Sequence, residues 1–133
     1  MSLLPARSFS VSIAHEWRSL YERIWHPAFF PQWAAGLADS ALRESGDHWL
    51  ADGDDGAFVI RFTPHNALGV MDHVVEPGDG SVIAVPLRVV ANGEGAEVVL
   101  TLYRQSDMTD EAFAADIKLV MRDLRALKRL VEA

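Results

Sequence analysis

The sequence predicts an α+β domain in which a curved antiparallel sheet of six strands packs against one long C-terminal helix. Three observations support this fold class. Residues 8–13 alternate strictly between polar and apolar side chains, which is typical of a half-buried strand. Five turn motifs divide residues 41–105 at the spacing of hairpins. Residues 109–132 contain neither glycine nor proline and carry apolar side chains at helical spacing.

The size and composition of the chain indicate a single domain, which we expect to span residues 1–133. Half of the residues are apolar and 23% are charged, a balance typical of a globular protein rather than of intrinsic disorder. The 12 basic and 19 acidic residues give a net charge of −7 without a dense Lys/Arg cluster, which disfavours nucleic acid as a partner. Without cysteine, disulfides and thiolate chemistry are excluded. We expect a cytoplasmic protein with no integral membrane segment.

The first strand leads into two short helices. The strand, residues 8–13, has one apolar face formed by Phe9, Val11 and Ile13. From His15 the apolar residues recur three and four positions apart, as Trp17, Leu20, Tyr21, Ile24 and Trp25. Pro27 ends this helix because the residue before a proline avoids the α region. A second helical segment is expected over residues 27–37, with Gly36 as its stop.

Five further strands are expected between the turn motifs. The turns fall at residues 46–47, 52–56, 63–66, 77–80 and 92–95. Between them lie apolar, β-branched segments, which predict antiparallel strands at residues 47–51, 57–62, 69–76, 81–91 and 96–104. These turns do not decide the register of the hairpins, and a slip of one residue would exchange the two faces of a strand.

The last element is one amphipathic helix over residues 109–132. Thr109 is a suitable N-cap, acidic residues follow in the first turn, and basic residues lie near the end, as the helix dipole favours. The helical stripe expected to face the sheet consists of Phe113, Ile117, Val120, Met121 and Leu124, continued by Leu127 and Val131. Because a single helix cannot fill the concave surface of a bent sheet, we expect a hollow between the two layers.

Several short motifs stand in a characteristic order along the chain. They are the segments 9–13 and 15–25, the Pro31-Gln32-Trp33 turn with Gly36, and the segments 69–74, 85–90 and 123–128. These motifs and the order of the elements resemble the SRPBCC superfamily, which groups START-related, polyketide cyclase/dehydrase and birch-pollen-allergen-like proteins with the helix-grip fold. The resemblance covers nearly the whole chain, although His26-Pro27 stands where the superfamily usually has an acidic residue or Asn before the proline. The resemblance implies a cavity for a lipid, a polyketide or another apolar small molecule, and it does not imply a shared catalytic set.

Asp72 and His73 are adjacent titratable residues on an expected strand. Because neighbouring side chains point to opposite faces of a strand, one of the two must face the concave side. We select His73, since imidazole can donate and accept hydrogen bonds and an unpaired buried carboxylate costs more. The opposite register would turn Asp72 inward, and a purely structural role for both residues is the alternative. Arg61 and Arg88, on expected neighbouring strands, are placed to pair with the outward residue.

No motif indicates a metal, a nucleotide or a hydrolase triad. His15-Glu16 begins like a zinc motif, but Ser19 stands where the second histidine is required. The acidic turn at residues 52–56 lacks the ligand series of a calcium loop. We therefore expect no metal and no cofactor, and no catalytic residue is assigned. An acid and a base for catalysis would have to come from Asp72, His73 and Tyr103.

The sequence and the resemblance together favour binding of a hydrophobic or amphipathic small molecule, of the lipid or polyketide class, between the sheet and the C-terminal helix. The alternatives are a polyketide cyclase/dehydratase-like enzyme that uses the same cavity and a chaperone-activator-like interaction module. A homodimer is left open. Trp33 is assigned to the cavity mouth by the resemblance. The candidate ligand-binding residues are Trp33, Phe58, Ile60, Phe62, Met71, His73, Tyr103, Phe113, Ile117 and Met121.

Overall fold

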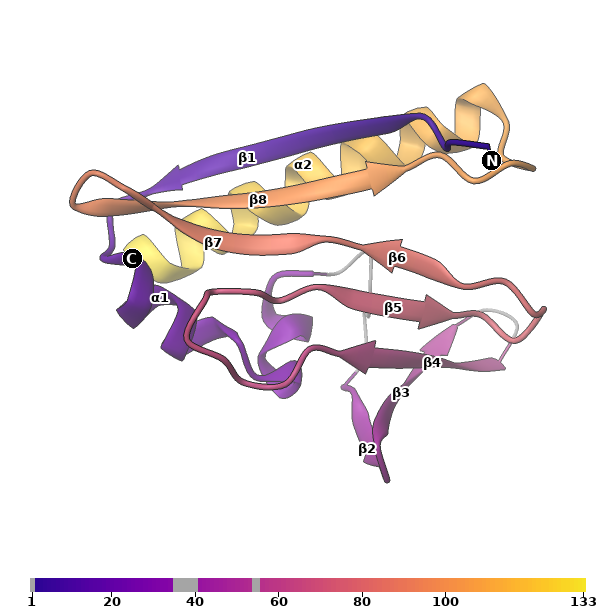
Figure 1. The fold of residues 1–133 in the computed structure, drawn as a ribbon, viewed down its shortest axis with the longest axis horizontal. Helices are drawn as coiled ribbons and strands as arrows, with labels where there is room; N and C mark the ends of the chain where they lie inside the picture. The colour runs from indigo at the N-terminus through magenta and orange to yellow at the C-terminus, as the bar shows by residue number, and fades with distance from the viewer. Residues whose placement is uncertain (1, 35–40, 54–55) are drawn as a thin grey trace.

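The computed structural model describes residues 2–34, 41–53 and 56–133 of the chain. Its elements, in chain order, are β1 (Ala6–Ile13), α1 (Trp17–Ile24), the 3₁₀ helix η1 (Pro27–Gln32), β2 (Arg43–Ser45), β3 (His48–Gly53), β4 (Gly56–Phe62), β5 (His73–Glu76), β6 (Ile83–Val85), β7 (Leu87–Asn92), β8 (Gly95–Tyr103) and α2 (Asp110–Glu132). Figure 1 shows a curved antiparallel arrangement of strands with α2 running along β1 and β8. The expected fold class is therefore confirmed.

The strands form two hydrogen-bonded sheets that meet at Pro86. One sheet has the order β2-β3-β4-β5-β6 and the other the order β1-β8-β7, and every pair within them is antiparallel. Pro86 separates β6 from β7 and has no N–H to donate to a neighbouring strand. The pairing register is the same on both sides of this break, since His73 pairs with Val85 and Val70 forms a bridge with Arg88. The two sheets consequently share one concave surface.

The sheet differs from the expected one in its number of strands, since the described part of the chain forms eight strands instead of six. The expected strand over residues 81–91 is divided by Pro86, because proline interrupts the ladder. The expected strand over residues 69–76 is regular only in β5, from His73 onward. The additional strand β2 has three residues, too few to show an alternating pattern in the sequence.

The two segments after β1 differ in type. Helix α1 begins after Glu16, whose carboxylate accepts hydrogen bonds from the N–H groups of Arg18 and Ser19, each at 3.0 Å. These two bonds lower the pKa of Glu16, and they identify the His15-Glu16 pair as a helix start. The expected second helix is the shorter 3₁₀ helix η1, and its expected stop at Gly36 lies outside the described residues.

The C-terminal end of α2 is held by hydrogen bonds to β1, to α1 and to the segment between them. Lys128 Nζ donates to the carbonyl oxygen of Ser12 at 2.6 Å, and Ala14 N–H donates to the Glu132 carboxylate at 2.8 Å. From α1, Arg23 Nη1 donates to the carbonyl oxygen of Val131 at 3.2 Å. In this half of the helix the buried apolar residues are Leu124, Leu127 and Val131. The N-terminal half has no fully buried residue, and the space between it and the sheet is only partly filled.

Candidate functional site

A cavity of about 270 Å³ lies between the concave surface of the sheet and α2. The sheet contributes Phe58, His73, Val75, Ile83, Val85, Leu87, Leu100 and Leu102. Helix η1 and the two residues after it contribute Phe30, Trp33 and Ala34. Helix α2 contributes Asp116, Leu119, Val120 and Asp123. Apolar side chains therefore form most of the wall, and the volume is close to the lower limit of small-molecule sites in proteins.

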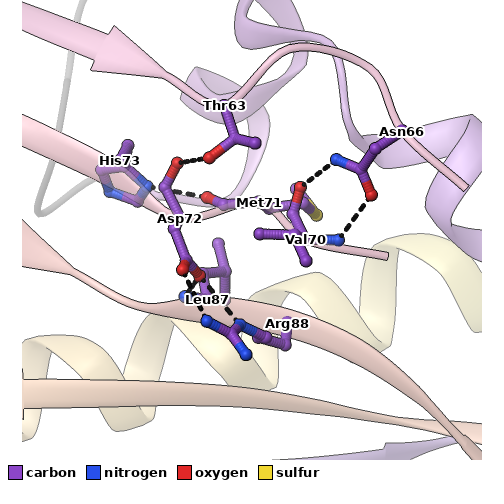
Figure 2. Close-up of polar contacts among 8 residues, drawn as sticks. All are labelled: Thr63, Asn66, Val70, Met71, Asp72, His73, Leu87 and Arg88. Carbon is purple, nitrogen blue, oxygen red and sulfur yellow. Dashed lines mark hydrogen bonds and ion pairs between the residues drawn. The ribbon is translucent and has the colours of Figure 1, made fainter. Parts of the chain in front are cut away.

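The break at Pro86 determines how Asp72 and His73 are held. Met71 N–H donates to the carbonyl oxygen of Leu87 at 2.8 Å, as in a regular ladder. Leu87 N–H donates at 2.8 Å to Oδ1 of Asp72, while the carbonyl oxygen of Met71 accepts from Nδ1 of His73 at 3.1 Å. Figure 2 shows these contacts at the junction of the two sheets. The two side chains thus provide hydrogen-bond partners for the N–H of Leu87 and the carbonyl oxygen of Met71, which the interrupted ladder leaves unpaired.

Asp72 faces away from the cavity and binds Arg88. Its two carboxylate oxygens accept hydrogen bonds from Nη2 of Arg88 at 2.8 Å and from Nε at 3.2 Å. Burial acts to raise the pKa of Asp72, but the hydrogen bonds from Arg88 and Leu87 and the charge of Arg88 outweigh it and lower the pKa. The group is therefore a carboxylate at neutral pH. A second pair on the same face joins Arg61 to Glu76 at 2.6 Å.

His73 faces the cavity and is only 6% exposed. Its ring lies against the rings of Phe30 and Phe62, at centroid distances of 5.5 Å and 5.4 Å. Burial lowers the pKa of His73, against the smaller opposing effects of the bond to Met71 and the charge of Asp72. The imidazole is therefore neutral, with the proton on Nδ1 because a carbonyl oxygen can only accept. Nε2 is left as an acceptor without a donor among the described residues, on a ring that lines the cavity.

Two acidic residues of α2 line the opposite wall. Asp116 and Asp123 are seven positions apart and so lie on one side of the helix, two turns from each other. Burial raises the pKa of Asp116. Asp123 is 9% exposed, and Nη2 of Arg122 lies 3.7 Å from its Oδ1. The wall thus combines carboxyl groups with an apolar surface.

Trp33 also lines the cavity, and it is more deeply buried than a residue at an open mouth would be. The side chain is 4% exposed and its ring lies 5.5 Å from that of Phe30. The buried indole N–H has no acceptor among the residues that the structure describes. A buried donor without an acceptor costs free energy, so this group destabilises the packing around Trp33.

The structure brings three of the ten candidate ligand-binding residues to the cavity wall: Trp33, Phe58 and His73. Ile60 and Met71 are buried in the core. Phe62 packs against the ring of Phe30 at 4.8 Å, behind the wall. Tyr103 follows Leu102, which lines the cavity, so alternation along β8 turns Tyr103 to the other face of the sheet.

The remaining three candidates lie on a side of α2 that does not line the cavity. Phe113, Ile117 and Met121 are half-buried and do not line the cavity. With 3.6 residues per turn, their stripe is rotated by about 100° around the helix axis from the lining residues. The sequence pattern did not indicate the lining side of α2, because Asp116 and Asp123 interrupt the apolar residues on that side. The spacing alone does not identify this pair in the sequence, because charged residues of α2 are also seven positions apart at 111/118, 118/125, 122/129 and 125/132.

The structure does not bring Asp72, His73 and Tyr103 together as an acid and a base. Only His73 of the three faces the cavity. Among the described residues there is no group of three His, Asp or Glu side chains placed to hold a metal ion. In the same part of the chain, no helix combines the length and the apolar character needed to cross a bilayer.

Comparisons with known proteins bear on the fold. No protein-family model matches the chain, and no curated protein matches it in sequence. Solved structures do match. DynU16, a protein of the dynemicin biosynthetic locus, superposes with a TM-score of 0.69 at 16% identity, and the chain spans 47% of its length. An uncharacterized protein from Bacillus thuringiensis superposes with a TM-score of 0.74 at 13% identity, over 97% of this chain and 100% of that one.

The Aha1 dimer from Colwellia psychrerythraea also shares the architecture. It superposes with a TM-score of 0.69 at 11% identity, and 94% of each chain is covered. At these identities the likeness concerns the fold, which DynU16 has in common with the polyketide cyclase group named above. The order of elements, the curved sheet and the long terminal helix lead to one conclusion: this chain has the helix-grip fold of the SRPBCC superfamily.

Proposed function

We propose that the protein binds one apolar or amphipathic small molecule, of the lipid or polyketide class, in the cavity between the sheet and α2. The observation that carries this proposal is the cavity itself, about 270 Å³ with walls formed mostly by apolar side chains. The similarity in fold to DynU16, a putative protein in the dynemicin biosynthetic locus, supports the polyketide class.

The physical argument is that this cavity is energetically unfavourable both when it is filled with water and when it is empty. A buried water needs two to four polar partners, and most of the wall offers none. An empty space leaves the lining side chains without dispersion contacts on one side. A ligand with an apolar body would restore those contacts, and a polar group on it would reach Nε2 of His73.

The binding test uses the neutral fluorophore N-phenyl-1-naphthylamine and native mass spectrometry. We expect saturable binding at one site per chain, and a bound small molecule in protein purified without added ligand. The variant Leu119→Trp places a larger side chain in the cavity wall and should weaken fluorophore binding. The control Ala115→Trp adds the same side chain on the exposed side of α2 and should not. Absence of saturable binding to the parent protein would reject the proposal.

A second candidate is acid–base catalysis in the same cavity, as in the polyketide cyclase/dehydratase alternative. The observation that favours it is that a neutral imidazole and a carboxyl group with a raised pKa, His73 and Asp116, both line the cavity. Turnover of an aromatic polyketide by the parent protein, lost in both His73→Phe and Asp116→Asn, would establish this candidate. Binding without turnover would leave the protein as a binding module.

A further inference from the structure

The polar groups that face the cavity are almost all hydrogen-bond acceptors. His73 offers Nε2, because its only ring proton is donated to Met71. Asp116 offers a carboxyl group that makes no hydrogen bond or ion pair with any described residue. Asp123 adds a second carboxyl group two turns along α2, and this group has a partner in Arg122. The neutral indole N–H of Trp33 is buried beside the wall.

Among the described residues, no cation is placed to pair with Asp116 on the cavity side. The lining residues include no Lys or Arg. The residues outside the described ranges are Met1, Ala-Gly-Leu-Ala-Asp-Ser at 35–40 and Asp-Asp at 54–55, and none of them has a basic side chain. Asp123 already has a partner, since Nη2 of Arg122, whose side chain is 58% exposed, lies 3.7 Å from its Oδ1. The carboxyl group of Asp116 is therefore the group of the wall that a cationic ligand would pair with.

An apolar surrounding strengthens the effect of this charge on a ligand. Charges interact more strongly in a medium of low polarity than in water, so a carboxylate ligand would be repelled by Asp116. Such a ligand would also find no donor on His73 or Asp116. An ammonium group donates up to three hydrogen bonds and is attracted by the carboxylate of Asp116.

Building on the proposed function, we infer that the ligand is an apolar molecule whose polar end is a protonated amine, with Asp116 as its counter-ion and Nε2 of His73 as an acceptor. Within the lipid and polyketide classes, this selects amine-bearing members such as aminated polyketides and long-chain bases. Fatty acids and other anionic lipids are excluded.

The test compares three ligands with one apolar body: 2-naphthylmethylamine, 2-naphthalenemethanol and 2-naphthoate. Each displaces N-phenyl-1-naphthylamine from the protein at pH 7. We expect the amine to bind about tenfold more tightly than the alcohol, and the carboxylate to bind most weakly. Equal affinities, or a preference for the carboxylate, would overturn the inference while the fluorophore signal upholds the proposed function. Failure of the fluorophore and of all three ligands to bind would reject both.

Variants of α2 test whether Asp116 causes the preference for the amine. Asp116→Asn should bring the affinity for the amine down to that for the alcohol, and Asp116→Lys should make the carboxylate the preferred ligand. The control Glu111→Gln removes one negative charge from an exposed position of the same helix and should leave the preference unchanged. Thermal melts of each variant verify folding, and Asp116→Asn decides the test if Asp116→Lys does not fold. An unchanged amine preference in Asp116→Asn would refute the assigned counter-ion.

Discussion

Asp72 binds Arg88 through both carboxylate oxygens, across the point where Pro86 interrupts the sheet. The same carboxylate accepts the N–H of Leu87, so one side chain connects the two sheets through backbone and side chain together. The adjacent His73 donates to the carbonyl oxygen of Met71, and the residue lines the cavity. A structural role and a candidate binding role therefore fall on two consecutive residues.

Replacing Asp72 by Ala should lower the free energy of unfolding by about 1–3 kcal/mol, because the N–H of Leu87 loses its acceptor. The matched control is Glu76→Ala, which removes the partner of Arg61 on the same face. This exposed pair binds no backbone group of the described residues, so its loss should cost clearly less than the loss of Asp72. Urea unfolding measures both values, and equal losses would contradict the role of Asp72 at the break.

The pKa of His73, lowered by burial, makes stability depend on pH. In the unfolded chain the imidazole titrates near its ordinary value of 6.5. As the pH falls below this value, the unfolded state takes up a proton that the folded state resists. The contribution of His73 is thus fully present above about pH 6.5 and is lost progressively on acidification. His73→Phe should flatten the decrease of Tm between about pH 6.5 and 5, and an unchanged slope would argue against a neutral buried imidazole.

The same substitution should separate ligands by their polar end. His73→Phe keeps an aromatic ring in the wall but removes the acceptor Nε2. Ligands with an amine or hydroxyl end should lose about 1 kcal/mol of binding free energy, roughly fivefold in Kd, whereas naphthalene should not. Isothermal titration measures the difference. If the polar ligands and naphthalene bind the variant equally well as the parent, Nε2 makes no contact with the ligand.

Two charged substitutions on α2 should differ greatly in effect. Leu127 is fully buried, so Leu127→Asp places an unpaired charge in the core and should prevent folding. Ile117 is half-buried, and Ile117→Asp leaves its carboxylate in reach of water at a much smaller cost. The apolar stripe read from the sequence predicts a severe effect at Ile117 as well. Circular dichroism melts of the two variants decide between the stripe and the observed orientation.

Gly69 should tolerate substitution less well than Gly93. Both glycines have positive φ, +74° and +57°, which strains any other residue. At Gly69 a Cβ would in addition collide with the carbonyl oxygen of Val89, whose N–H donates to Gly69, whereas at Gly93 it would meet open space. Gly69→Ala should therefore lose clearly more stability than Gly93→Ala in urea unfolding. Similar losses would show that the strand opposite Gly69 can move aside.

The parts of the fold that follow a regular period were predictable from the sequence. The alternation in β1 predicted the correct inner face, since Phe9, Val11 and Ile13 are its less exposed residues in the structure. The N-cap at Thr109 is also confirmed, since its side chain accepts the N–H of Ala112 at 3.1 Å. These elements depend on local chemistry, which a single sequence contains.

The cavity wall was predictable only in part, because it depends on packing between distant segments. Packing against the sheet determines which side of α2 faces the cavity. Asp116 and Asp123 lie on that side, so it does not form a continuous apolar stripe in the sequence. The face of Tyr103 depended on the register of β8, which the turns leave undecided. Trp33, assigned to an open mouth, is buried because η1 packs it against Phe30.

The junction at Pro86 makes the two sides of the cavity differ in how freely they can change during evolution. His73 takes part in the sheet, so a mutation that alters its chemistry toward a ligand also disturbs the joint between the sheets. Asp116 has no such second task among the described residues, and its replacement leaves the backbone contacts of the helix intact. Related proteins that acquire new ligands should therefore diversify first along α2, while the Asp72-His73 dipeptide is retained for folding.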